Sequence, residues 1–210
     1  MISLSEILHT IAQALMIPCL IILLILMAGA VWQIGDIVVE YIAERRKHKC
    51  NIPQLLRDVH TAGANGLAEL IENSGLLRRQ KKALLELAES RSLPKDTLTA
   101  LAERLLATEE ARNARTTSVT DMIAKLGPMF GLLGTLIPLG PGIVALGQGD
   151  TVTLSESMNV AFDTTIAGVI SAAVASVISH IRKRWYNDDM VSLETLMEAV
   201  LEEVTADVEG

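Results

Sequence analysis

The sequence has few aromatic residues and lacks the motifs of catalytic and cofactor sites. Only 3% of the 210 residues are aromatic. No Gly-rich loop carries the Lys and Ser/Thr of a phosphate site, no Cys/His set has metal-binding spacing, and no nucleophile, base and acid form a set. We therefore expect neither an enzyme nor a cofactor. The net charge of -7 and the lack of a basic stripe with interleaved aromatics argue against a nucleic-acid partner.

Cysteine is also scarce, with Cys19 inside an apolar run and Cys50 in a basic segment. We expect Cys19 inside a membrane span and Cys50 on the cytoplasmic side, where the two thiols cannot meet, so no disulfide is predicted.

Lysine and arginine are absent from two long parts of the chain, residues 1–44 and 126–181. Positive charge collects on the cytoplasmic side of membrane proteins. The distribution therefore predicts a multi-pass protein of the cytoplasmic (inner) membrane, with its N-terminus outside and its C-terminus in the cytoplasm. The predicted extracytoplasmic parts are residues 1–15 and 148–156, and the cytoplasmic parts are residues 37–121 and 182–210.

Long apolar runs are the dominant feature that is present. One lies between Glu6 and Asp36, one runs from Leu126 to Gln148, and the third, "MNVAFDTTIAGVISAAVASVISHI", is interrupted only by Asp163. Each is long enough to span a bilayer. We predict an all-α integral membrane protein in contact with the lipid bilayer. Its three transmembrane helices are expected at residues 16–36, 122–147 and 157–181.

The predicted cytoplasmic part, residues 37–121, is expected to be helical, because its apolar residues recur at three- and four-residue spacing. Breaks are predicted at residues 73–75 ("NSG") and 92–94 ("SLP"). No further breaker occurs from Pro94 to Gly127, so one helix of roughly 50 Å should run into the second span. The third span should likewise continue past "RKRWY" towards the C-terminus.

The second span contains the unusual stretch "GPMFGLLGTLIPLGPG". Gly127, Gly131 and Gly134 fall at helical spacing on one face, where another helix backbone can approach closely. We predict that these glycines form a packing groove.

Two prolines of the same stretch, Pro138 and Pro141, lack a backbone N–H and so free the carbonyl four residues earlier. Thr135 lies beside one of these carbonyls, and its hydroxyl can both donate and accept in a water or ion path. In the alternative interpretation, the hydroxyl bonds back to the carbonyl of Leu132 or Gly131 and is structural.

The third span carries Asp163, Thr164 and Thr165 followed by many small residues. Asp163 is an ion-pathway candidate because carboxylates inside a membrane are usually functional, although it can also be solvated at the outer end. Ser179 is expected to be dispensable for ion movement. A small polar face is predicted along Thr165, Ala172 and Ser179, with Gly168 and Ser176 beside it.

Two motifs resemble the MotA/TolQ/ExbB proton-channel family. "FGLLGT" at Phe130 to Thr135 is similar to the family's second-span motif ending in Gly-Thr, and "AFDTTIAG" is similar to the motif opening its last span, which aligns Thr165 and Gly168. The order of spans and cytoplasmic segments also resembles the three-span TolQ and ExbB members.

The resemblance implies a homo-oligomeric ring, usually a pentamer, around single-span helices of an ExbD-, TolR- or MotB-like partner. The partner would supply a protonatable Asp, and Thr135 and Thr165 would line the path beside it. Where several ExbB-type members have a Glu, this chain has Val160, and its nearest acids are Glu156 and Asp163. The Thr164–Thr165 pair is similar to sodium-driven motor members, so the ion can be H⁺ or Na⁺.

Two functions follow as hypotheses. The first is the ring-forming subunit of a motor that converts proton or sodium flow into motion of a partner helix. The second is a passive membrane scaffold in which the glycine grooves assemble other proteins and the hydroxyls are merely buried. Only the first requires a small single-span partner with one membrane Asp.

Overall fold

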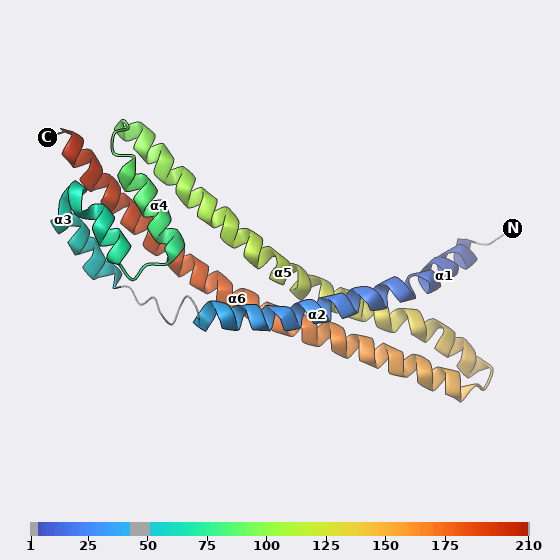
Figure 1. Cartoon of the computed structure of the whole chain (residues 1–210). Coiled ribbons are helices and arrows are strands. Elements are labelled where there is room, and N and C mark those ends of the chain that lie inside the picture. The colour runs from blue at the N-terminus through green and yellow to red at the C-terminus, as the bar shows by residue number, and fades with distance from the viewer. Residues whose placement is uncertain (1–3, 43–50, 210) are drawn as a thin grey trace. The chain divides into compact units, whose positions relative to one another are not determined.

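The structure, a computed structural model, describes residues 4–42 and 51–209. Every regular element in these two ranges is a helix, as the sequence predicts. Cys50 lies outside the described residues, as do residues 43–49 of the predicted cytoplasmic part. The helices, shown in Figure 1, are α1 (Leu4–Ala14), α2 (Met16–Glu40), α3 (Ile52–Asn73), α4 (Arg78–Glu89), α5 (Lys95–Gly147) and α6 (Thr151–Glu209).

The chain divides into two compact units, and α5 and α6 each pass through both of them. We call the first the apolar unit; it consists of Met1–Ile37 and Thr117–Ile181. The second, the polar unit, consists of Val38–Thr116 and Arg182–Gly210.

Three helical stretches of the described chain are long and apolar enough to cross a membrane. Their most apolar windows have a mean hydropathy of 2.8 for the α1–α2 stretch, 1.8 for α5 and 1.7 for α6. The prediction of an all-helical protein with three candidate membrane-spanning helices is therefore confirmed.

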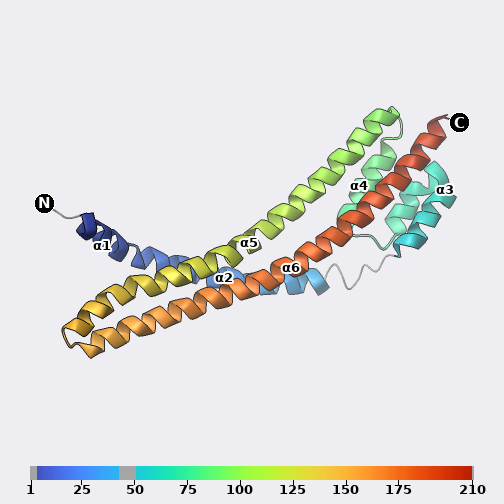
Figure 2. The same ribbon diagram turned by 180° about the vertical axis from the view of Figure 1, so that it is seen from behind.

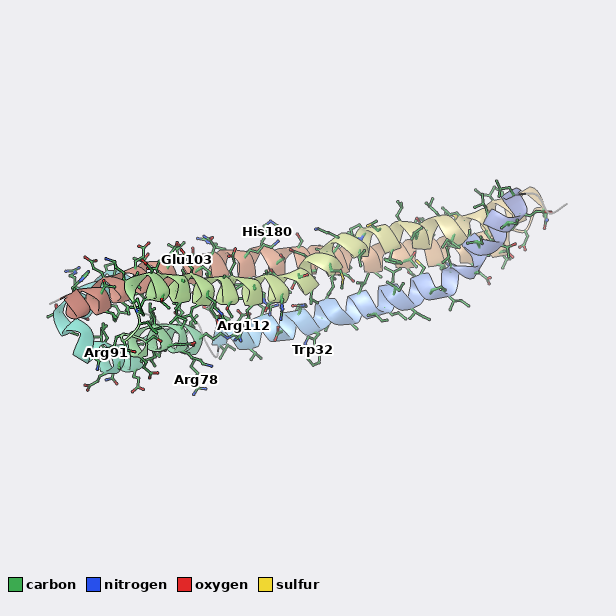
Figure 3. The ribbon with its side chains drawn as sticks, turned by 90° about the horizontal axis from the view of Figure 1, so that it is seen from above. Trp32, Arg78, Arg91, Glu103, Arg112 and His180 are labelled. Carbon is green, nitrogen blue, oxygen red and sulfur yellow. The ribbon has the colours of Figure 1, made fainter. Side chains whose placement is uncertain are left out.

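α2 has one side against the rest of the apolar unit and one side open. Leu26 and Ala30 pack with Ile123 of α5 and Ala175 of α6. On the open side, Trp32 is 79% exposed and projects away from the helices (Figure 3). Exposed apolar residues recur along this side, as expected for a helix that contacts lipid.

A three-residue turn joins α5 to α6 at the end of the apolar unit (Figure 1). Gly149 takes a φ of 78°, which glycine adopts without steric cost. Asp150 then caps α6 by accepting hydrogen bonds from the backbone N–H groups of Val152 and Thr153 and from the Thr153 hydroxyl. These bonds, the hydroxyl first, hold the pKa of Asp150 below its ordinary value.

The polar unit has its own hydrophobic core, contributed by α3, α4, the start of α5 and the end of α6. Leu67, Leu84, Leu98 and Leu196 are among its fully buried members. Figure 2 shows α3 and α4 beside the C-terminal part of α6. Apolar residues at helical spacing thus form a small bundle, which is the structure that the pattern predicts.

The predicted helix breaks are confirmed, because α3 ends at Asn73, α4 ends at Glu89 and α5 begins at Lys95. One break was missed. Gly63, inside α3, has a φ of 63° and kinks the helix, which apolar periodicity alone does not reveal.

α5 and α6 are uninterrupted helices of 53 and 59 residues. At 1.5 Å per residue they are about 80 and 90 Å long. The prediction that the second and third spans continue into long helices is confirmed.

The end of α2 contacts α6 inside the polar unit. Arg182 Nε donates to Glu40 Oε2 at 3.1 Å, and the rings of Tyr41 and Trp185 stack with centroids 6.1 Å apart. Tyr186 also hydrogen-bonds Glu40. A polar and aromatic cluster therefore joins the two helices.

Candidate functional site

The glycines of α5 and α6 allow the two backbones to touch in the apolar unit. A Cβ atom on Gly127 would lie 2.7 Å from the carbonyl oxygen of Gly168. A Cβ atom on Gly168 would lie 2.8 Å from the Cα of Gly131, and one on Gly134 would lie 2.6 Å from the Cβ of Thr164. No side chain fits at such distances, so these positions require glycine for this close approach.

These contacts also define which residues of the antiparallel pair lie at one level. Gly142 meets Ser157, Gly134 meets Thr164, and Gly127 meets Ala172. When two residues lie at the same level, their residue numbers therefore add up to about 299, within about one helical turn.

This register brings Thr135 and Thr165 together. The Cα of Thr165 lies 3.7 Å from the position of a Cβ on Gly131, one turn from Thr135 on α5. Thr135 is half-buried, and so is Thr165. The two hydroxyls singled out from the sequence thus come from different helices and lie within about one turn of each other.

All three threonine hydroxyls of this region donate to carbonyls of their own helix. Thr135 donates to Leu132 at 2.7 Å, which is the structural alternative expected from the sequence. Thr165 donates to Ala161 at 3.0 Å, and Thr164 is within 2.9 Å of the same carbonyl. Each hydroxyl oxygen keeps lone pairs that can accept from water or from another donor.

The face of α6 that packs on α5 includes Ala172 and Ser179 of the predicted small face, and Gly168 beside it. Thr164, only 5% exposed, points into the contact with Gly134, whereas Thr165 and Ser176 lie half-buried at its edge. Packing is centred on the residues that meet glycine, so at this level Thr164 lies deeper in the contact than Thr165. The buried members are Ala161, Thr164, Gly168, Ser171, Ala172, Ala175 and Ser179.

The prolines do not break α5, which continues through Pro138 and Pro141. Both line a pocket of about 220 Å³ near the turn that joins α5 to α6. Glu156 and Val160 line the same pocket, one turn apart on α6. An acidic side chain, Glu156, therefore lies at this pocket.

Asp163, the other acid of the third span, is exposed, and its neighbours Phe162 and Ile166 are exposed as well. It lies on the side of α6 away from the contact with α5. The structure therefore does not bring Asp163 together with Thr164 at the glycine contact.

A second polar group lies at the other end of the apolar unit. The Ser179 hydroxyl donates to Asp121 Oδ1 at 2.5 Å, joining α6 to α5. Beside it, Thr120 is fully buried, and its hydroxyl has no hydrogen-bond partner. The sequence analysis did not predict the Asp121–Ser179 bond. It placed Asp121 as the last residue of the cytoplasmic segment and expected Ser179 to be dispensable.

Residues 70–195 match the MotA/TolQ/ExbB proton channel family. This match spans more than half of the 210 residues. The chain belongs to the MotA/TolQ/ExbB proton channel family.

The family match includes the glycine contact between α5 and α6 and leaves α1 and α2 outside it. MotA/TolQ/ExbB proteins are channel and motor subunits rather than enzymes. Together with the three apolar helices, membership makes this chain a multi-pass membrane protein. A search of curated proteins found no match.

Within this MotA/TolQ/ExbB chain, one signal in the sequence could have revealed the Asp121 group. Asp121 lies fourteen residues before Thr135, and Ser179 lies fourteen residues after Thr165. Fourteen residues are close to four helical turns, so each pair lies on one side of its helix.

Proposed function

We propose that this chain is the ring-forming subunit of an ion-driven motor in the cytoplasmic membrane. In this proposal, several copies surround the single-span helices of an ExbD-, TolR- or MotB-like partner, with five copies as the expected number. Proton or sodium flow past the partner's membrane Asp moves the partner relative to the ring. The chain catalyses no bond chemistry.

The observation that carries the proposal is the placement of Thr135 and Thr165. They lie at a common level of a tightly packed helix pair, and both are half-buried at its edge. Because the glycine contact fixes α5 against α6, the two hydroxyl oxygens are held at defined positions. Their free lone pairs can orient water or a dehydrated cation beside a partner carboxylate.

The surface of the apolar unit supports the ring. Asp163 is exposed between exposed apolar side chains, and an ionised carboxylate facing lipid is costly. A neighbouring subunit or a water-filled space would remove that cost. A single three-span chain offers neither on this side of α6.

The orientation in the membrane rests on the distribution of Lys and Arg. We propose that the turn between α5 and α6 is extracytoplasmic and that α3, α4 and the end of α6 are cytoplasmic. The proposed spans are residues 16–36, 122–147 and 157–181. Ions would then enter from the side of the Glu156 pocket.

The driving ion is proposed to be the proton, with sodium as the competitor. A proton path needs only carboxylates, hydroxyls and water, and Glu156 and Thr135 fit that need. The Thr164–Thr165 pair supplies the oxygen ligands that a sodium path would use, although Thr164 is buried against Gly134. Motor activity that collapses when external sodium is replaced by potassium, and is indifferent to a protonophore, would overturn the proton assignment.

The test uses Thr135→Val and Thr165→Val in the complex with its co-expressed partner, reconstituted in liposomes. Valine keeps the shape of threonine and removes the hydroxyl, so assembly should be unchanged, with a stability loss of about 1 kcal/mol or less. Ion flux should fall by about two orders of magnitude if the hydroxyls hold the water chain.

Thr195→Val is the matched control. Thr195 is also half-buried on α6 and also donates to a carbonyl of its own helix, that of Val191, at 2.9 Å, but it lies in the polar unit. Complex yield and flux are measured on the same preparations. Full flux in both Thr135→Val and Thr165→Val would refute the role of the two hydroxyls, and no flux in the wild-type complex would refute the motor proposal.

A passive scaffold is the second candidate, and one observation favours it. The hydroxyls of Thr135, Thr164 and Thr165 already donate to their own helices, as purely structural threonines do. A scaffold predicts no flux in any variant or in the wild type, and it needs no partner with a membrane Asp.

A further inference from the structure

The start of α4 carries a concentration of positive charge that does not stabilise the helix. Arg78, Arg79, Lys81 and Lys82 fall in its first turn or directly after it, and the first turn holds no acidic residue. The N-terminus of a helix is already the positive end of its dipole, so cations there are unfavourable. Departures of this kind from local preference are expected at functional sites.

Three of these cations have no partner of opposite charge. The side chains of Arg78, Arg79 and Lys82 are exposed, and none forms an ion pair with a carboxylate of the residues that the structure describes. Lys81 donates to the backbone carbonyl of Glu72. Arg78 and Lys82, four residues apart, lie on one side of α4, and Arg78 projects away from the helices (Figure 3). These side chains are therefore available to an external anion.

The cluster lies at the end of the polar unit where α6 enters it. The polar unit includes α6 from Arg182 onwards. Arg79 is close enough to Tyr186 for the two groups to interact electrostatically, and Gln80 Nε2 donates to the carbonyl of Asp189 at 3.1 Å. The start of α4 is therefore beside the first two turns of α6 in this unit.

Aromatic and apolar side chains lie at the same end of the polar unit. Glu40 hydrogen-bonds Tyr186, and the next residue, Tyr41, stacks on Trp185. Tyrosine and tryptophan are enriched at the depth of lipid headgroups, where one end of the ring is apolar and the other is wet. The exposed apolar residues around Tyr41 are Val38, Val39 and Ile42. Cations, rings and apolar side chains together are typical of a surface that meets lipid headgroups.

The depth of the cluster agrees with this interpretation in the membrane orientation proposed above. The proposed third span ends at residue 181, and Tyr186 is five residues further along α6, about 8 Å. The headgroup layer extends roughly 5–8 Å beyond the hydrocarbon core on each side of a bilayer. Tyr186 would thus lie at the edge of this layer, within reach of the long arginine side chains beside it.

We propose that Arg78, Arg79 and Lys82 bind the phosphate group of an anionic phospholipid in the cytoplasmic leaflet. The guanidinium groups offer paired N–H donors to the phosphate oxygens, and Lys82 adds a third positive charge. The exposed apolar residues around Tyr41 contact the lipid chains. Glu40 does not compete for the cations, because its carboxylate already pairs with Arg182.

A second copy of the chain is a weaker candidate for the same cations. The exposed acids of the α6 tail that it would offer are Glu194, Glu198 and Glu202. They begin twelve residues beyond Arg182, about 18 Å further from the entry of α6 into the polar unit. Copies in a ring stand parallel, so the acids of a neighbour would lie at a different level from the cluster.

The test measures lipid binding to the purified full-length chain in detergent by native mass spectrometry. Dioleoyl phosphatidylglycerol is compared with dioleoyl phosphatidylcholine, which has the same acyl chains and no net charge. Inorganic phosphate is the anion without chains. The wild type should prefer phosphatidylglycerol, and an equal concentration of inorganic phosphate should not displace it, because only the lipid adds apolar contacts.

The decisive variant is Arg78→Gln with Arg79→Gln. Each cation near a lipid headgroup contributes roughly fivefold in affinity, so phosphatidylglycerol should bind roughly 30-fold more weakly. The matched control is Lys95→Gln with Arg104→Gln, which removes two other exposed cations of the polar unit. Arg104 is twelve residues before Thr116, where α5 leaves this unit, so the control should bind the lipid as the wild type does.

Two further variants separate lipid binding from folding. Arg78→Lys with Arg79→Lys keeps the charge and should lose less than about fivefold, because lysine attracts phosphate without the paired donors. Lys82→Gln should lose roughly fivefold, and it remains informative if the double glutamine variant does not fold. Added phosphatidylglycerol should raise the melting temperature of the wild type and the control, but not that of the double glutamine variant.

The outcomes separate this site from the motor proposal. Equal phosphatidylglycerol affinity in the wild type, the double glutamine variant and Lys82→Gln overturns the lipid site. Displacement by an equal concentration of inorganic phosphate also overturns it and identifies a free phosphate compound as the ligand. The proposal rests on the membrane orientation of the proposed motor, but binding is measured without ion flux. An absence of flux in the wild-type complex overturns the motor and leaves the lipid result standing.

Discussion

Arg182 and Glu40 form an ion pair, with Nε 3.1 Å from Oε2 and side chains only 2% and 16% exposed. The pair fixes the end of α2 to α6 within the polar unit. Removing one member of a buried ion pair leaves an uncompensated charge, whereas replacing both with apolar groups is often neutral.

We therefore predict that Glu40→Gln destabilises the protein by about 3 kcal/mol. The double variant Glu40→Gln with Arg182→Met should recover most of this loss. Denaturant titration of the detergent-solubilised protein, followed by circular dichroism, measures both. Glu198→Gln, at an exposed acid of α6, is the control and should change the free energy of unfolding by less than about 0.5 kcal/mol. Equal losses for the single and double variants would contradict the pairing.

Tyr186 provides a spectroscopic test of the same cluster. Burial, followed by the charge of Glu40 and its hydrogen bond, raises the pKa of Tyr186 to about 12. In a Tyr41→Phe background, the tyrosinate absorbance should thus appear near pH 12. Adding Glu40→Gln should move the transition towards the ordinary value of about 10. An unmoved transition would show that Glu40 is not its partner.

The direction of the linked stability change follows from the raised pKa of Tyr186. The unfolded chain releases the phenol proton near pH 10, whereas the folded chain keeps it until about pH 12. The contribution of Tyr186 is fully present below about pH 10 and is lost as the pH rises to about 12. Unfolding measured from pH 9 to 12 should show this decline in the wild type and a smaller one in Tyr186→Phe.

The backbone contact at Gly168 predicts a steric penalty. A Cβ atom there would lie 2.5 Å from the Gly127 carbonyl oxygen, so Gly168→Ala should destabilise the helix pair by about 1–3 kcal/mol. Gly140→Ala is the matched control, because a Cβ at Gly140 has no neighbour within 4 Å. Thermal unfolding in detergent compares the two variants. A Gly168→Ala protein as stable as Gly140→Ala would contradict the close contact.

The proposed topology predicts opposite labelling at two serines. In a background without Cys19 and Cys50, a membrane-impermeant thiol probe should react with Ser155→Cys from outside intact cells. The same probe should react with Ser90→Cys only after the membrane is opened. The reverse pattern would overturn the orientation.

The oligomer prediction concerns the protein in mild detergent. Native mass spectrometry or electron microscopy should find a ring, with five copies expected by family resemblance. A stable monomer that retains ion flux with its partner would contradict the ring. The control is the Gly168→Ala protein, whose weakened helix pair should reduce ring yield.

Features that depend on local chemistry could be predicted from the sequence, whereas those that depend on helix rotation could not. The breaks after Asn73 and Glu89 follow from turn residues and a proline, and the long α5 follows from the absence of breakers. The glycine spacing at Gly127 identified a surface that does contact another backbone.

The errors have a common physical origin. The sequence did not indicate that Thr164 lies deeper in the helix contact than Thr165, since a rotation of one residue, 100°, depends on how two helices interlock. The Asp121–Ser179 bond joins residues 58 apart, and the fourteen-residue spacing from Thr135 and Thr165 places each residue on a side of its helix without pairing the two helices. The kink at Gly63 was missed because glycine is compatible with both helical and left-handed backbone.

The three-residue turn and the glycine contact also bear on how the protein enters the membrane during synthesis. The first apolar stretch, with a mean hydropathy of 2.8, can partition into lipid alone, whereas α5 and α6 reach only 1.8 and 1.7. Pro138 and Pro141 leave carbonyl groups of α5 without helical donors, and a lone helix in lipid could not satisfy them. The α5–α6 pair is therefore expected to insert as one unit, after α6 has left the ribosome. Neither α5 nor α6 is expected to insert efficiently alone.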